Sequence, residues 1–132
     1  MRNVFISYSS LDEEEAIQIR QALEANDIPC WMAPRNIPLG STYTSAIPKG
    51  IKECPVFIVI MTRNTQTSYW VPREIEQAIN HHKLIIPLFL DHVRYNDEFS
   101  FLIHREHRCY ALNQAPLPEE LFSQIREYVA SK

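Results

Sequence analysis

Two unbroken runs of apolar residues constrain most strongly what this chain can fold into. They cover residues 55–61 (PVFIVIM) and 84–90 (LIIPLFL). Each run is too short to cross a membrane as a helix and has the length of a β-strand. A strand that is apolar at every position is typical of a sheet whose two faces are both covered. The two runs therefore predict a parallel sheet with helices on either side.

Shorter strand-like segments and helical patterns alternate with these two runs. The shorter strands are predicted at 3–8, 28–32 and 109–112. The helices are predicted from a capping box at 10–13 to about residue 26, in two pieces on either side of Pro48, at 69–81 and at 118–129, while 91–107 is predicted to be irregular or weakly helical. Because strand and helix alternate five times, we expect an α/β, flavodoxin-like open sandwich: a five-stranded parallel sheet in the order 2-1-3-4-5 with helices on both faces.

That strand order also predicts where a ligand would bind. The order reverses between the first and third strands, and open α/β sheets bind ligands at the carboxyl ends of the strands at such a switch point. Residues 8–11 and 62–68 follow these two strands. We therefore expect the functional residues to gather around these two segments.

Composition limits the classes of function. A chain of 132 residues is expected to form one domain, residues 1–132. Its formal net charge of -3 disfavours nucleic-acid binding, which needs clustered basic residues, and it has no apolar run long enough to span a membrane. The three cysteines lie far apart in the sequence, which favours a reducing compartment. We therefore expect a cytoplasmic protein that binds neither nucleic acid nor membrane.

Several common active-site motifs are absent. The chain has two glycines, too few for a GxGxxG or Walker loop, and it contains neither GxSxG nor HExxH. A phospho-acceptor receiver of the same fold carries an aspartate just after its third strand, where this chain has Met61-Thr62-Arg63. His104, His107 and Cys109 form an H-x-x-H-x-C pattern that could suggest zinc, but no second ligand pair has a suitable spacing, so we expect no metal site.

Three segments together resemble one known family. They are 5–9 (FISYS), 30–41 (CWMAPRNIPLGS) and 68–78 (SYWVPREIEQA), the last followed by 85–88 (IIPL). In this order and spacing they resemble the Toll/interleukin-1 receptor (TIR) domain family, specifically its bacterial branch. The resemblance runs from residue 3 to about residue 90 and is fainter beyond.

The resemblance implies an activity. Family members that cleave NAD⁺ at the bond between nicotinamide and ribose share a W-x-x-x-E pattern, which this chain has as Trp70-Val71-Pro72-Arg73-Glu74. By that resemblance Glu74 is the catalytic acid of an NAD⁺ glycohydrolase (an NAD⁺ nucleosidase, or an ADP-ribosyl cyclase). NAD⁺ is then the substrate, no cofactor is needed, and the products are nicotinamide and linear, cyclic or conjugated ADP-ribose. The chemistry is consistent, because a carboxylate beside the ribose stabilises an oxocarbenium-like transition state. Without the resemblance, the pattern alone favours a solvated glutamate on a helix at Glu74, and the family match reverses that preference.

The remaining substrate-binding candidates are aromatic or hydroxyl side chains. By family position Trp31 faces the nicotinamide or its ribose, although an edge-strand tryptophan also packs well in a core; Trp70 has the same two alternatives. Tyr8 and Ser9 can hold ribose or phosphate near the start of the first helix, where Ser10 is predicted to be a cap. Tyr43 is predicted to line the pocket.

The resemblance also implies assembly. The loop formed by Pro34, Arg35, Asn36, Ile37 and Pro38 is the segment that the family uses for contacts between domains, and Arg35 is also a candidate for the pyrophosphate. Asn36 stands where many bacterial relatives have an acid. In the family two subunits usually complete one site, so the resemblance implies a homo-oligomer or filament. It also implies a fused or separate nucleotide-sensing partner. The biological role that it implies is defence against phage. The alternatives are a non-enzymatic TIR–TIR assembly module and a decoy that enters a host's TIR signalling.

Overall fold

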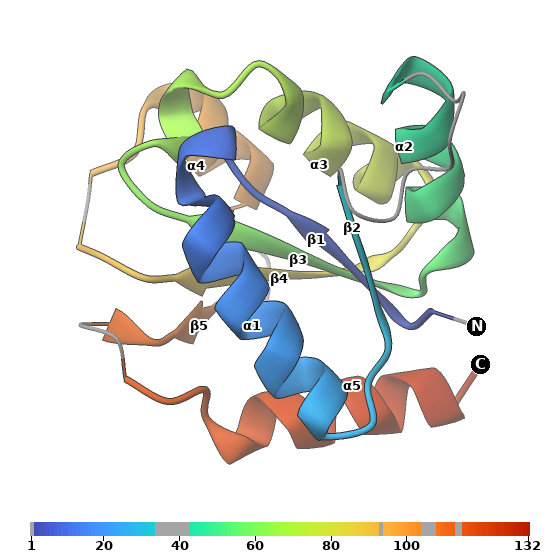
Figure 1. Cartoon of the computed structure of the whole chain (residues 1–132). Coiled ribbons are helices and arrows are strands. Elements are labelled where there is room, and N and C mark those ends of the chain that lie inside the picture. The colour runs from blue at the N-terminus through green and yellow to red at the C-terminus, as the bar shows by residue number, and fades with distance from the viewer. Residues whose placement is uncertain (1, 34–42, 93, 104–107, 113–114) are drawn as a thin grey trace.

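A computed structural model describes residues 2–33, 43–92, 94–103, 108–112 and 115–132. Its centre is one parallel sheet of five strands in the order β2-β1-β3-β4-β5 (Figure 1). The strands are β1 (Val4–Ser7), β2 (Cys30–Met32), β3 (Val56–Met61), β4 (Leu84–Phe89) and β5 (Cys109–Tyr110). The predicted fold class and strand order are confirmed, and the switch point lies between β1 and β3 as expected.

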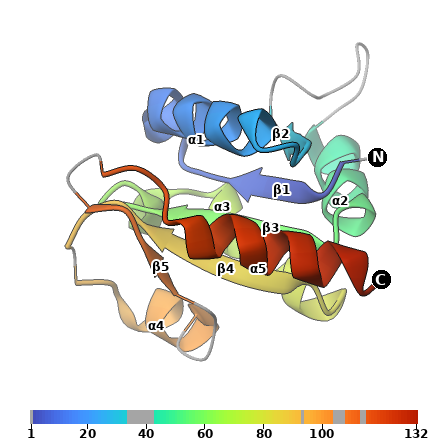
Figure 2. The ribbon, with the colours of Figure 1, turned by 90° about the horizontal axis from the view of Figure 1, so that it is seen from below.

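Helices cover both faces of the sheet (Figures 1 and 2). The α-helices are α1 (Glu13–Ala25), α2 (Tyr43–Glu53), α3 (Trp70–Asn80), α4 (Asp97–Ile103) and α5 (Glu119–Ala130), with short 3₁₀ helices η1 (Ser10–Asp12) and η2 (Thr65–Thr67). Buried residues of α1 and α5 pack on one face, and those of α2, α3 and α4 pack on the other. The predicted alternation therefore produces two apolar cores separated by one sheet.

The strands read as apolar at every position because both of their sides are covered. Every residue of β3 is buried, and β3 pairs with β1 and β4 over its length. Within β1, Ile6 belongs to the core under α1 and α5, whereas Phe5 belongs to the core under α2 and α3. Because side chains alternate along a strand, Ser7 points to the same face as Phe5. This places the Ser7 hydroxyl under α3.

The predicted start of the first helix is wrong in detail. The capping residue is Ser9 rather than Ser10: its Oγ accepts a hydrogen bond from the Leu11 N–H at 3.3 Å and begins η1, and α1 starts only at Glu13. Asp12 is the reason, because its carboxylate is held by residues that follow β3 instead of capping its own helix. A long-range contact thus overrides the local capping pattern.

The predicted break at Pro48 is also wrong, since α2 runs continuously from Tyr43 to Glu53 with Pro48 inside it. A proline inside a helix costs roughly 3 kcal/mol in lost hydrogen bonding and steric conflict. The buried side chains of Ala46, Ile47 and Ile51 pack against the sheet and offset that cost. Pro72, in the first turn of α3, is tolerated as predicted.

The state of the cysteines and the length of the helices can also be compared with the sequence predictions. All three cysteines are free thiols. In the described part of the chain, no helix has both the length and the apolar character needed to cross a membrane.

Candidate active site

Glu74 is a buried carboxylate on the inner face of α3. Val71, Ile75 and Ala78 are fully buried on this helix, and helical spacing puts Glu74 on the same side. Only 6% of Glu74 is exposed. The burial of a charged side chain costs free energy unless hydrogen bonds or an opposite charge compensate it, so this position needs a physical explanation.

One hydrogen bond ties Glu74 to the sheet. The Ser7 hydroxyl, at the end of β1, donates to Glu74 Oε1 at 2.6 Å, and both side chains are buried. Burial raises the pKa of Glu74 from its ordinary value of 4.5 to about 7, while the Ser7 hydrogen bond opposes that rise. A carboxyl group with this pKa changes its charge near neutral pH, as the acids and bases of active sites do.

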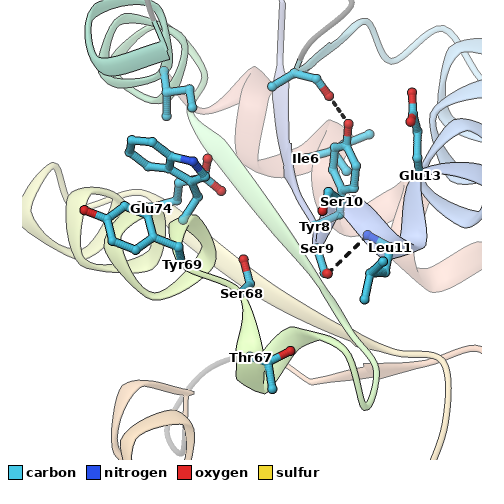
Figure 3. Close-up of a pocket in the computed structure, with 13 residues that line it drawn as sticks. Ile6, Tyr8, Ser9, Ser10, Leu11, Glu13, Thr67, Ser68, Tyr69 and Glu74 are labelled. Carbon is cyan, nitrogen blue, oxygen red and sulfur yellow. Dashed lines mark hydrogen bonds between the residues drawn. The ribbon is translucent and has the colours of Figure 1, made fainter.

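Glu74 lines a cavity of about 460 Å³ at the switch point of the sheet. Figure 3 shows its wall, with Glu74 of α3 and Tyr69, the residue before α3, on one side and Tyr8, Ser9 and Leu11 from the segment after β1 on the other. Six residues give the wall its hydroxyl groups: Tyr8, Ser9, Ser10, Thr67, Ser68 and Tyr69. The cavity therefore combines one buried carboxylate with several hydroxyl groups, which suits a ligand rich in hydroxyls and phosphates.

A second buried carboxylate holds the loops of this site together. Asp12 Oδ2 accepts a hydrogen bond from the Thr62 hydroxyl at 2.5 Å, and Asp12 Oδ1 accepts one from the Asn64 side-chain amide at 2.8 Å. Thr65 braces the same turn, since its Oγ1 accepts from the Thr62 N–H at 2.9 Å. The segments that follow β1 and β3 are thereby fixed to each other beside the cavity.

Comparison with known proteins identifies the family. A model of the TIR domain family matches residues 4–125. The chain belongs to the TIR domain family. No curated protein gives a significant match.

Solved structures, TIR domains among them, share the fold of this domain. The TIR domain of the Toll-related receptor TRR-2 from Hydra magnipapillata has a TM-score of 0.79 at 20% identity, covering 96% of this chain and 99% of that one. The TIR-STING receptor from C. gigas, in complex with 2′,3′-cGAMP, has a TM-score of 0.72 at 18% identity over 96% of this chain and 38% of that one. The CMP N-glycosidase BcmB from Clostridium botulinum has a TM-score of 0.60 at 19% identity over 95% and 99%.

Four of the residues singled out from the sequence meet at the cavity of this TIR domain. Tyr8, Ser9, Trp70 and Glu74 all line it. The Tyr8 hydroxyl donates to the Ala33 carbonyl oxygen, which ties the end of β1 to the segment after β2. Trp70 and Glu74 also border a smaller cavity of about 290 Å³ between α2 and α3. Trp70 and Glu74, the two specified residues of the W-x-x-x-E pattern, therefore both line cavities.

Trp31 is separated from the others. It is 4% exposed, stacks on Phe5 with ring centroids 4.9 Å apart, and lies against Gly50 of α2, where an added Cβ would come within 2.6 Å of its ring. It does not line the cavity that Glu74 faces. The structure therefore gives Trp31 the core-packing role, because its large apolar surface is buried between the sheet and α2.

Other predicted residues cannot be placed. Arg35 and the rest of the assembly loop, 34–38, lie outside the described residues, as do His104 and His107. Tyr43 is the first residue of α2, but its side chain is not described. Within the described ranges, no three His, Cys, Asp or Glu side chains come together in a way that could hold a metal ion.

The sequence interpretation missed Ser7 and Tyr69. Ser7 belongs to the FISYS segment, and the alternation of side chains along a strand could have shown that it faces the same way as Phe5. Tyr69 is 60% exposed at the edge of the cavity, with the Arg73 guanidinium 3.7 Å from its ring centroid and the Trp70 ring perpendicular to it. The i, i+4 spacing of Tyr69 and Arg73 at the start of the predicted helix could have indicated this contact.

Proposed function

We propose that this TIR domain is an NAD⁺ glycohydrolase in which Glu74 is the catalytic residue. The observation that carries the proposal is the position of Glu74: a buried carboxylate with one described hydrogen-bond donor, lining a cavity at the switch point. The TIR family match and the W-x-x-x-E pattern support the same role. The structural neighbour described as a CMP N-glycosidase cleaves another bond between a base and ribose, on the same fold.

The reaction needs no cofactor. In NAD⁺ the nicotinamide nitrogen is cationic, so the bond between C1′ and that nitrogen breaks with its electron pair moving to the ring, which leaves as neutral nicotinamide. Positive charge then develops on the ribose, and the Glu74 carboxylate stabilises it electrostatically. Water adds its oxygen to C1′ and loses a proton, which gives ADP-ribose; attack by a nitrogen of the adenine instead gives a cyclic product.

The cavity residues have separate roles in this proposal. Tyr8 and Ser9 bind the hydroxyls of the ribose or the phosphates, and Trp70 supplies an aromatic surface near the carboxylate. The ionised form of Glu74 is the active one. Its pKa of about 7 in the ligand-free protein falls when the cationic nicotinamide ring enters, because an opposite charge favours ionisation.

The test measures nicotinamide release. Purified protein at high concentration, with a crowding agent to promote assembly, is incubated with NAD⁺ and the products are separated by chromatography. We expect the native chain to release nicotinamide and Glu74→Gln to be slower by roughly 10²–10³-fold, since it lacks the charge but keeps the shape. Glu127→Gln, the same change at an exposed position of α5, is the matched control and keeps full activity.

Two outcomes would redirect the proposal. CMP is included as a second substrate, and release of cytosine without nicotinamide would replace NAD⁺ by a nucleoside monophosphate. If neither base is released from the assembled protein, the enzymatic role is wrong and the non-enzymatic assembly module takes its place.

We further propose that the domain works as an assembly in defence against phage. The resemblance to bacterial TIR proteins motivates this, and one structural neighbour, the TIR domains of the Roq1 resistosome, belongs to an activated assembly (TM-score 0.65, 19% identity, over 99% of this chain and 82% of that one). Cells that express the native chain should survive or restrict phage better than cells that express Glu74→Gln. Equal phage yields in the two would contradict the defensive role.

A further inference from the structure

Ser7 is the one described side chain that hydrogen-bonds Glu74. It lies at the last position of β1, where its backbone pairs with Val59 of β3, so its Cα is fixed by the sheet. Only 1% of Ser7 is exposed. A buried hydroxyl must find an acceptor inside the protein, and the Glu74 Oε1 atom at 2.6 Å is that acceptor.

We propose that Ser7 is a positioning residue for Glu74: its hydroxyl fixes one carboxylate oxygen, favours the charged form of the carboxylate, and leaves the second oxygen for the substrate. The inference rests on the proposed function of Glu74. The described residues supply no hydrogen-bond partner for the second oxygen, Oε2. A short hydrogen bond to a charged acceptor is stronger than one to a neutral acceptor, so it selects the ionised form.

The charges around Glu74 do not perform this task. On α3 itself Arg73 is exposed, donates to the Tyr69 carbonyl oxygen at 2.7 Å and lies over the Tyr69 ring, while Glu76 is exposed. Across the cavity, Glu13 of α1 is exposed and the Tyr8 hydroxyl donates to the Ala33 carbonyl oxygen.

From α2, the residues that border the adjoining cavity are Ile47 and Pro48, which carry no charge. Burial and Ser7 are the two influences on the Glu74 pKa, and they act in opposite directions. Because no cation of the described residues forms an ion pair with Glu74, the carboxylate depends on the Ser7 hydroxyl for its charge.

The experiment compares Ser7→Ala with Ser7→Thr, which keeps the hydroxyl and suits a strand. We expect the acidic limb of the kcat/KM profile to move to higher pH by about one to two units in Ser7→Ala, because kcat/KM reports the free enzyme. The rate should therefore fall by roughly 5- to 50-fold at pH 7 and be largely recovered above pH 9. Ser7→Thr should keep the native profile. An equal loss at every pH would mean that Ser7 acts only through packing, and would overturn the proposal.

A second measurement does not depend on turnover. The side-chain carboxyl carbon of Glu74, labelled with ¹³C and assigned by its absence in Glu74→Gln, is titrated by NMR in the ligand-free native and Ser7→Ala proteins. A higher midpoint in Ser7→Ala supports the inference, and an unchanged midpoint overturns it, whether or not the native chain cleaves NAD⁺. If NAD⁺ is not cleaved and the midpoint still moves, the proposed function fails while the link between Ser7 and the charge of Glu74 stands.

Discussion

Two buried carboxylates lie at the same edge of the sheet, and they are satisfied differently. Asp12, 2% exposed, has a side-chain donor on each oxygen, the Thr62 hydroxyl and the Asn64 amide, and it lines none of the cavities described above. Glu74, 6% exposed, has one side-chain donor among the described residues, Ser7, and faces a cavity. A carboxylate whose oxygens are both occupied holds structure together, whereas one with an oxygen left over can act on a ligand.

The contrast predicts opposite effects on stability. Asp12 contributes to stability by joining two loops. Glu74 lowers the stability of the fold at neutral pH, since its burial makes ionisation unfavourable. Enzymes commonly accept such a cost at the residues that perform their chemistry.

The largest effect is expected from Asp12→Ala. It leaves the buried Thr62 hydroxyl and the half-buried Asn64 amide without their charged acceptor, and hydrogen bonds to charged groups contribute about 1.5–3 kcal/mol each. We expect the free energy of unfolding to fall by about 4 kcal/mol, measured by urea denaturation. Asp12→Asn should lose less, because its amide oxygen still accepts from one of the two donors. If Asp12→Ala is as stable as the native protein, the structural role assigned to Asp12 is wrong.

The second effect has the opposite sign and depends on pH. The rise in the Glu74 pKa from 4.5 to about 7 corresponds to about 3 kcal/mol of lost stability. Below pH 4.5 the carboxyl is protonated in the folded and the unfolded chain, so it contributes nothing. Between pH 4.5 and about 7 the unfolded chain loses the proton first, so the native protein becomes less stable as pH rises.

Glu74→Gln should therefore match the native protein near pH 4 and exceed it by up to about 3 kcal/mol at pH 8. Urea denaturation at both pH values measures the difference, with Glu127→Gln as the control whose stability follows the native protein. A Glu74→Gln variant that is less stable than the native protein at pH 8 would show that the carboxylate stabilises the fold, which contradicts the contrast with Asp12.

The location of the site, at the carboxyl ends of β1 and β3, could be predicted from the sequence. The side-chain contacts within the site could not. The apolar runs at β3 and β4 reflect burial on both faces. The second and last strands are less apolar in sequence, which placed them at the outside of the sheet and so predicted the strand order and the switch point. The contact between Ser7 and Glu74 joins residues 67 positions apart, and the one between Thr62 and Asp12 joins residues 50 apart. Such contacts depend on tertiary packing, which also overrode the expected cap at Ser10 and the expected break at Pro48.

The two tryptophans differ in the same way as the two carboxylates: one is enclosed in the core and the other lines a cavity. Trp70 borders the cavities next to Glu74, whereas Trp31 is enclosed by Phe5 and by Gly50 of α2. If Trp31 could turn toward a ligand, the space above Gly50 would tolerate a methyl group. If Trp31 is a fixed part of the core, it would not, because close-packed interiors resist added volume.

The smallest of the three effects on stability is therefore expected from Gly50→Ala. The new Cβ would lie 2.6 Å from Trp31 Cε2 and 2.7 Å from its Cδ2, so the indole or the helix must shift. Overpacking of this kind costs about 1–3 kcal/mol, and the higher helix propensity of alanine returns about 1 kcal/mol. We expect a net loss of about 1 kcal/mol in urea denaturation, with Lys49→Ala, an exposed position of the same helix, as the control that loses nothing. A Gly50→Ala variant as stable as that control would show that Trp31 moves freely, which would restore it as a candidate for contact with the substrate.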